Sequence, residues 1–205
     1  MTSIRSFIQR LINKETGITI VSGLPRSGTS MMMAALEAGG MTLITDHIRC
    51  ADGNNPKGYF EFEQVKKLPH GEISWLKNAQ GKAVKVISAL LKYLPDTYRY
   101  KVLFLERDIE EILASQKRML ERTGTKEEHP ISDVDMGQAL QDHVAQVKSW
   151  IKEQDWVQMF PVRYNLILQN PQKEFLKVVN FLELPLDVLS MVKIVDPALY
   201  RERNN

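Results

Sequence analysis

The chain of 205 residues is poor in the side chains that build disulfides and metal sites. It has one cysteine, Cys50, and four histidines, of which no two stand at the spacing of metal ligands. The composition therefore argues against a disulfide framework and against a structural zinc site. We expect a protein that requires no metal.

Long apolar runs and an excess of one charge are also missing. No stretch reaches about eighteen uninterrupted apolar residues, the length that spans a bilayer. Residues 1–16 combine apolar positions at helical spacing with basic ones and lack a signal-peptide cleavage site, so we expect an amphipathic helix, with membrane-surface attachment as the alternative. The 27 basic and 25 acidic residues give a net charge of +2, too small to suggest nucleic-acid binding. These features predict a cytoplasmic protein without a transmembrane segment.

The rest of the sequence alternates short apolar runs with amphipathic helical patterns. The runs that we expect to be strands are residues 18–22, 41–45, 83–87, 100–106 and 157–162. The helical patterns cover residues 29–38, 109–122, 136–153, 171–182 and 186–192. Pro161 places the last strand at an edge or a bend of the sheet. This alternation predicts one α/β domain over residues 1–205, a three-layer fold with a mainly parallel sheet flanked by helices.

The most informative motif lies between the first strand and the first helix of this pattern. Residues 23–30 read Gly-Leu-Pro-Arg-Ser-Gly-Thr-Ser, a glycine-bearing loop that opens into a helix N-terminus. Such a loop surrounds one anion with backbone N–H groups and the positive end of the helix dipole. Thr29 stands where the nucleotide triphosphatases have their phosphate-binding lysine, and Arg26 supplies a cation instead. The pattern favours phosphate binding over an ordinary strand-to-helix turn.

This loop resembles the 5′-phosphosulfate loop of the sulfotransferase superfamily, P-[KR]-S-G-T-[ST]. The matching residues are Pro25, Arg26, Ser27, Gly28, Thr29 and Ser30. The resemblance implies that 3′-phosphoadenosine 5′-phosphosulfate (PAPS) is the donor, that a sulfuryl group passes in line to a hydroxyl or amine, and that 3′,5′-adenosine bisphosphate is the product. It also implies a fold like that of the P-loop nucleotide triphosphatases and no need for a metal ion. Arg26 is the candidate that meets the charge developing on the leaving phosphate.

A second match follows the strand at residues 100–106. The superfamily binds the 3′-phosphate of the donor with an arginine at a strand end and a serine eight residues later, and Arg107 and Ser115 keep that spacing. A guanidinium suits a phosphate dianion because it donates two parallel hydrogen bonds. The alternative is a surface pair of Arg107 with Asp108 and an incidental helix serine.

A weaker match covers the C-terminal part of the chain. Residues 163–184 resemble the segment R-Y-E-D-L…D-P…F-L-G-L, in which the tyrosine, here Tyr164, lies against the adenine. Glu183 replaces the glycine of that segment, and Met31 replaces a tryptophan that stacks on the base. Arg201 is a candidate ligand of the 3′-phosphate, although a solvated tail is an equally good interpretation.

The sequence offers several candidates for the residue that removes the proton from the acceptor. Cytosolic members use a histidine in a K-x-H stretch, but here Lys85 is followed by Ile87 at that position. Other members use a glutamate, and Glu61 is our candidate; a solvent-facing role remains an alternative for it. The other candidates for the base are Glu63, His47 and Asp46.

The acceptor itself is not identified by any motif. Residues 46–59 and 124–133 are long irregular segments, where we expect the acceptor to bind. Two other functions stay open: a P-loop kinase or nucleotide hydrolase that uses ATP with magnesium, and a nucleotide-binding module without turnover. Neither the oligomeric state nor the competence of the site follows from the sequence.

Overall fold

The computed structural model describes residues 17–46, 48, 58–123 and 132–196. Its centre is a five-stranded sheet with the strand order β2-β3-β1-β4-β5. The strands are β1 (Ile18–Gly23), β2 (Leu43–Ile44), β3 (Ala83–Lys85), β4 (Tyr100–Glu106) and β5 (Val157–Arg163). Every neighbouring pair is parallel, which confirms the predicted α/β fold with a parallel sheet.

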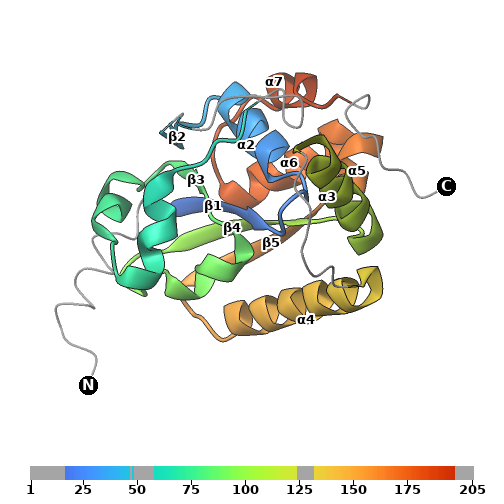
Figure 1. Ribbon diagram of the computed structural model, residues 1–205. Coiled ribbons are helices and arrows are strands. Elements are labelled where there is room, and N and C mark those ends of the chain that lie inside the picture. The colour runs from blue at the N-terminus through green and yellow to red at the C-terminus, as the bar shows by residue number, and fades with distance from the viewer. Residues whose placement is uncertain (1–16, 47, 49–57, 124–131, 197–205) are drawn as a thin grey trace.

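Helices cover both faces of the sheet, giving three layers (Figure 1). One face packs against α2 (Thr29–Ala38), α6 (Pro171–Leu182) and α7 (Val188–Lys193). The other packs against α4 (Asp133–Lys152) and three 3₁₀ helices, η1 (Glu63–His70), η2 (Ser74–Asn78) and η3 (Ser88–Tyr93). The helices α3 (Ile109–Thr123) and α5 (Tyr164–Gln169) follow the ends of β4 and β5.

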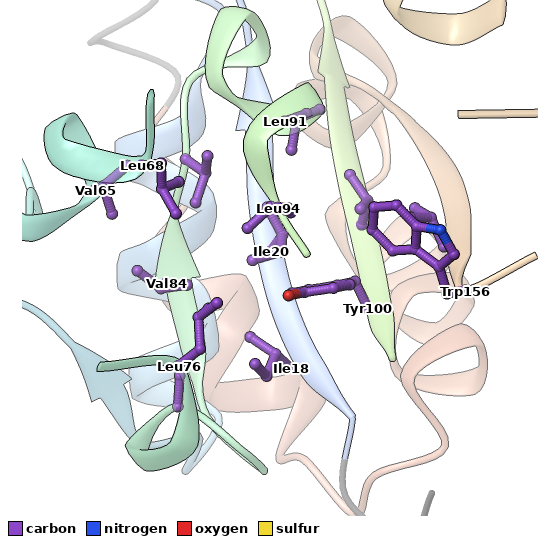
Figure 2. Packing of buried hydrophobic residues seen from close by; sticks show 14 of the residues in the cluster. Ile18, Ile20, Val65, Leu68, Leu76, Val84, Leu91, Leu94, Tyr100 and Trp156 are labelled. Atoms are coloured by element: carbon purple, nitrogen blue, oxygen red, sulfur yellow. The ribbon is translucent and has the colours of Figure 1, made fainter. Parts of the chain in front are cut away.

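The two central strands supply side chains to both faces. Ile20 and Phe104 belong to the core beneath α4, whereas Val21 and Leu105 belong to the core beneath α2. This alternation with a period of two is the property of a strand buried on both faces. Figure 2 shows the α4 side of the core, where the Tyr100 ring packs edge-on against Trp156 with 5.6 Å between ring centroids.

The topology determines where a ligand can bind. Gly23, the last residue of β1, pairs with Leu105 near the end of β4, so the two strands finish side by side. From β1 the chain runs into α2 on one face of the sheet. The later strands β3 and β4 pair with β1 on its two opposite sides. In open parallel sheets, ligands bind at such a switch point beyond the carboxyl ends of the strands.

Most predicted elements are confirmed, with differences at their ends. The helices over residues 29–38 and 171–182 and the strand over 100–106 have the predicted bounds, and Pro161 lies in β5, an edge strand. The strands predicted over 41–45 and 83–87 are shorter, because pairing in them is confined to two and three residues. The helix α4 begins earlier than predicted, since Ser132 caps it by accepting a hydrogen bond from Asp135 N at 3.1 Å.

Two further expectations concern the helix over residues 1–16 and the lack of a transmembrane segment. The helix predicted over residues 1–16 lies outside the described residues. Among the helices that are described, none is long and apolar enough to cross a membrane.

Glu183 gives a test of the local fold. It ends α6 in the left-handed conformation, with φ 58°. The sulfotransferase segment R-Y-E-D-L…D-P…F-L-G-L, which residues 163–184 resemble, has glycine at this position. We expect Glu183→Gly to unfold about 2–4 °C above Glu183→Ala, because both variants lose the exposed ion pair with Lys101 but only alanine keeps the strained Cβ. Calorimetric melting of both variants measures the difference. Identical melting temperatures would show that no backbone strain is relieved at this position.

Candidate phosphate and sulfuryl-transfer site

The loop between β1 and α2 has the backbone of an anion site. Arg26 and Gly28 both have left-handed conformations, with φ 70° and 101°, and residues in such conformations turn successive N–H groups toward one point. Gly28 is the N-cap of α2, and no side chain caps this helix end. The first N–H groups of a helix have no partner within the helix, so they are available to an anion placed here.

Both glycines of the loop are required by close contacts. A Cβ at Gly23 would lie 2.7 Å from the carbonyl oxygen of Leu105, and a Cβ at Gly28 would lie 2.4 Å from the Tyr164 ring. These distances are too short for any side chain. The loop therefore packs directly on β4 and on Tyr164, which fixes its position relative to both.

Arg107 and Ser115, predicted to form one subsite, do meet at the loop. Arg26 Nε donates a hydrogen bond to Ser115 Oγ at 3.0 Å, and Arg107 Nη1 donates to the carbonyl oxygen of Arg26 at 3.2 Å. The Arg107 guanidinium also lies over the Tyr164 ring, 4.9 Å from its centroid. The structure thus brings together Arg26, Arg107, Ser115 and Tyr164, four of the residues singled out in the sequence.

Tyr164 is enclosed between the loop and Arg107. It is the first residue of α5, a short helix that the sequence patterns did not predict. Burial raises the pKa of its hydroxyl, and the nearby positive charge of Arg107 partly opposes this shift. The phenol is therefore neutral at physiological pH.

The partner of Arg107 was missed in the sequence. Arg107 Nε pairs with Glu111 Oε2 at 2.8 Å, not with Asp108, and the two side chains are 8% and 2% exposed. The spacing of four residues at the start of a helix is the signal that could have identified this pair. Because Nε pairs with Glu111, the guanidinium is held with Nη1 toward the Arg26 carbonyl oxygen.

Lys85 reaches the loop from β3, on the other side of β1. Its Nζ donates to Ser30 Oγ at 3.2 Å and to the carbonyl oxygen of Tyr59 at 2.9 Å. Phe60, the next residue, has φ 53°, an uncommon conformation for a residue with a side chain. Strain of this kind tends to gather at functional sites. Lys85 adds a further cation beside the predicted phosphate site.

The candidates for the base have different surroundings. The Asp46 carboxylate accepts hydrogen bonds from the backbone N–H groups of Ile48 and Glu63, at 3.0 and 2.6 Å. It thereby connects Asp46 to Glu63, the first residue of η1. Glu63 forms an exposed pair with Lys66. The backbone of Glu61 is anchored by Thr45, whose hydroxyl donates to the Glu61 carbonyl oxygen at 2.9 Å. His47, Arg201 and most of the two expected acceptor segments lie outside the described residues.

The residues present fit a nucleotide with two anionic groups. Ser27 Oγ is buried in the loop and has no hydrogen-bond partner in the described part of the chain, so an anion oxygen or water would satisfy it. The uncapped N-terminus of α2 offers backbone donors to one anionic group, and Arg107 and Ser115 carry side-chain donors that suit a second. No group of three His, Cys, Asp or Glu side chains among the described residues is placed to hold a metal ion.

A cavity of about 590 Å³ lies between α3, α4 and the ends of β4 and β5. Arg163 and Asn165 line this cavity, whereas the ring of Tyr164 between them packs against Gly28. The ion pair of Lys148 with Glu106, at 2.6 Å, closes part of its wall. Its lining includes Leu24 of the phosphate loop and two residues that contact the loop, Leu105 and Arg107.

The buried pair of Arg107 and Glu111 can be tested by its stability. We expect Glu111→Ala to lower the free energy of unfolding by about 3–5 kcal/mol, because it leaves the Arg107 charge buried without its partner. Glu110→Ala is the matched control: Glu110 is exposed in the same first turn of α3, and its loss should change stability by no more than about 0.5 kcal/mol. Urea unfolding measures both. Similar losses for the two variants would show that the Arg107 pair contributes nothing specific.

Similarity to known proteins identifies the family of this chain. No curated protein matches the sequence. The solved structures that match this chain include two sulfotransferase domains. The "Sulfotransferase Domain from the Synechococcus PCC 7002 Olefin Synthase" has a TM-score of 0.51 at 13% identity over 92% of this chain and 88% of its own. The "Sulfotransferase Domain from the Curacin Biosynthetic Pathway" has a TM-score of 0.49 at 14% identity over 88% of this chain and 78% of its own. The model of the sulfotransferase domain family matches residues 17–202, and the chain therefore belongs to the sulfotransferase family.

Proposed function

We propose that this sulfotransferase uses PAPS as its donor and transfers the sulfuryl group in line to a hydroxyl or amine. The observation that carries the proposal is the meeting of Arg26, Arg107 and Ser115 at the ends of β1 and β4. Two guanidinium groups and a hydroxyl are concentrated there beside an uncapped helix N-terminus. This arrangement suits a nucleotide that carries phosphate groups at two separate positions.

The proposed binding residues divide between the two ends of the donor. The backbone of the loop and the hydroxyls of Ser27, Thr29 and Ser30 bind the 5′-phosphosulfate. Arg107 and Ser115 bind the 3′-phosphate, with Arg201 as a further ligand from the C-terminal segment. Tyr164 contacts the adenine with a ring already held between Gly28 and Arg107.

The bound donor supplies an activated sulfuryl group. The acceptor oxygen or nitrogen forms a bond to sulfur while the bond from sulfur to the 5′-phosphate oxygen breaks, and its electron pair stays on that oxygen. Arg26 and Lys85 stabilise the negative charge that develops on the leaving phosphate and on the sulfuryl oxygens. Positioning and charge stabilisation of this kind account for catalysis without a covalent intermediate on the protein.

The proton of the acceptor passes to a carboxylate in this proposal. Glu61 follows Phe60 and Tyr59, whose carbonyl oxygen binds Lys85, so its backbone lies close to the cation that contacts the loop. Ile87, at the position where cytosolic members have histidine, is 44% exposed and has no group that accepts a proton. A general base of this type contributes about 10²–10⁴ to the rate.

The structure favours this function over ATP chemistry with magnesium. In the nucleotide triphosphatases the hydroxyl at the position of Ser30 binds Mg²⁺. Here the ammonium group of Lys85 lies 3.2 Å from that hydroxyl and repels a second cation. Thr29 also lacks the charge of the lysine that binds the β and γ phosphates in those enzymes.

Calorimetry distinguishes the two nucleotide classes directly. We expect 3′,5′-adenosine bisphosphate to bind in the presence of EDTA at least about tenfold more tightly than AMP, because only the bisphosphate engages Arg107 and Ser115. ATP with magnesium should bind more weakly than the bisphosphate. Tighter binding of ATP with magnesium would overturn the proposed donor and favour the kinase or hydrolase.

Glu61 can be separated from Glu63 by a pair of isosteric changes. We expect Glu61→Gln to lower the conversion of PAPS to the bisphosphate by about 10²–10⁴ without changing the affinity for the bisphosphate, since the amide cannot accept the proton. Glu63→Gln should keep the wild-type rate, because Glu63 pairs with Lys66 at the surface. An unchanged rate in Glu61→Gln would assign the base to another residue.

A further inference from the structure

The carbonyl oxygen of Tyr59 accepts hydrogen bonds from two side chains that the proposed reaction also needs. Lys85 Nζ donates to this oxygen at 2.9 Å, and Ser30 Oγ donates to it at 3.4 Å. In the proposed function, Ser30 binds the 5′-phosphosulfate and Lys85 stabilises charge on the leaving phosphate and on the sulfuryl oxygens. The Tyr59 carbonyl and the transferable group of the donor therefore compete for the same two side chains.

The phosphosulfate binds these side chains more strongly than the carbonyl does. A serine hydroxyl has one proton, so Ser30 cannot donate to the Tyr59 carbonyl and to a phosphosulfate oxygen at once. Its bond to the carbonyl is long, whereas hydrogen bonds to anionic oxygens are shorter and roughly twice as strong as those between neutral groups. The positive charge of Lys85 is likewise attracted more strongly by an anion than by a neutral carbonyl. We therefore expect the bound donor to take both side chains from Tyr59.

The residue after this carbonyl is held in an unfavourable backbone conformation. Phe60 has φ 53°, which costs free energy in a residue that has a Cβ. The carbonyl before it is held by the two donors just described, and the carbonyl of the next residue, Glu61, accepts from Thr45 Oγ1 at 2.9 Å and from Asp46 N at 3.2 Å. Strain of this kind persists only where the surrounding structure enforces it. Loss of the bonds to Tyr59 therefore allows Phe60 to relax.

We propose that Phe60 is a positioning residue through which the phosphosulfate of the donor sets the direction of the Glu61 side chain. This inference rests on the proposed function. The bound phosphosulfate withdraws both side chains from the Tyr59 carbonyl, and Phe60 then leaves the left-handed conformation. Because the Glu61 carbonyl stays bonded to Thr45, this change turns the Glu61 side chain and does not carry the whole segment away. The base is thus brought to the acceptor only while the donor is bound.

One carbonyl signal reports the first step of this coupling. Tyr59 and Phe60 form the one Tyr-Phe pair of the chain, so ¹³C in tyrosine carbonyl groups combined with ¹⁵N in phenylalanine amides gives a single carbonyl–amide signal. We expect PAPS, added in EDTA without an acceptor, to move this carbonyl signal upfield, because a carbonyl carbon is more shielded after its hydrogen bonds are lost. An unmoved signal at saturating PAPS would overturn the inference. If calorimetry instead shows that the wild type does not bind PAPS, the proposed donor fails, so the two failures are distinguishable.

Kinetics test the second step, the placement of Glu61. Phe60→Gly and Phe60→Ala both remove the ring, but only glycine adopts φ 53° without strain, so it keeps this conformation even after the donor has taken Lys85 and Ser30. At saturating PAPS, we expect kcat for its conversion to the bisphosphate to be at least about threefold lower in Phe60→Gly than in Phe60→Ala. In the Glu61→Gln background, the same two variants should differ by less than about twofold. Equal kcat values for the two single variants, or an undiminished difference in the Glu61→Gln background, would contradict the positioning role.

Discussion

The parallel pairing of β1 with β4 is the constraint on which the site depends. Gly23 lies opposite Leu105, close enough that a Cβ on Gly23 would strike the Leu105 carbonyl oxygen at 2.7 Å. Because the two strands end at the same level, the loop after β1 and the arginine after β4 emerge side by side. The contact of Arg107 with the Arg26 carbonyl follows from this register.

A buried ion pair stabilises the geometry that the strands create. A lone Arg107 at 8% exposure would be costly to bury, and Glu111 at 2% exposure balances its charge. The Tyr164 ring packs on one face of the guanidinium and against Gly28. Glu111 thus contacts Arg107, Arg107 contacts Tyr164, and Tyr164 contacts Gly28. This series of contacts connects α3 with α2, the helix that follows the phosphate loop.

Short-range motifs of the site could be predicted from the sequence, whereas contacts between residues far apart in the chain could not. The glycine loop and the eight-residue spacing of Arg107 and Ser115 are short-range patterns, and both predicted residues that the structure brings together. The contact of Lys85 with Ser30 joins residues 55 positions apart, so no spacing rule could find it. The 3₁₀ helices and α5 were missed because they are too short to show a hydrophobic period, and Glu111 was overlooked because Asp108 offered an apparent partner nearer to Arg107.

The left-handed backbone of Arg26 sets stability and chemistry against each other at one position. With φ 70°, this residue occupies a conformation for which glycine is the most favourable amino acid. Glycine there would relax the loop, yet it would remove the guanidinium that donates to Ser115 Oγ. Selection for thermal resistance alone would therefore tend to erase the charge that we propose acts in sulfuryl transfer.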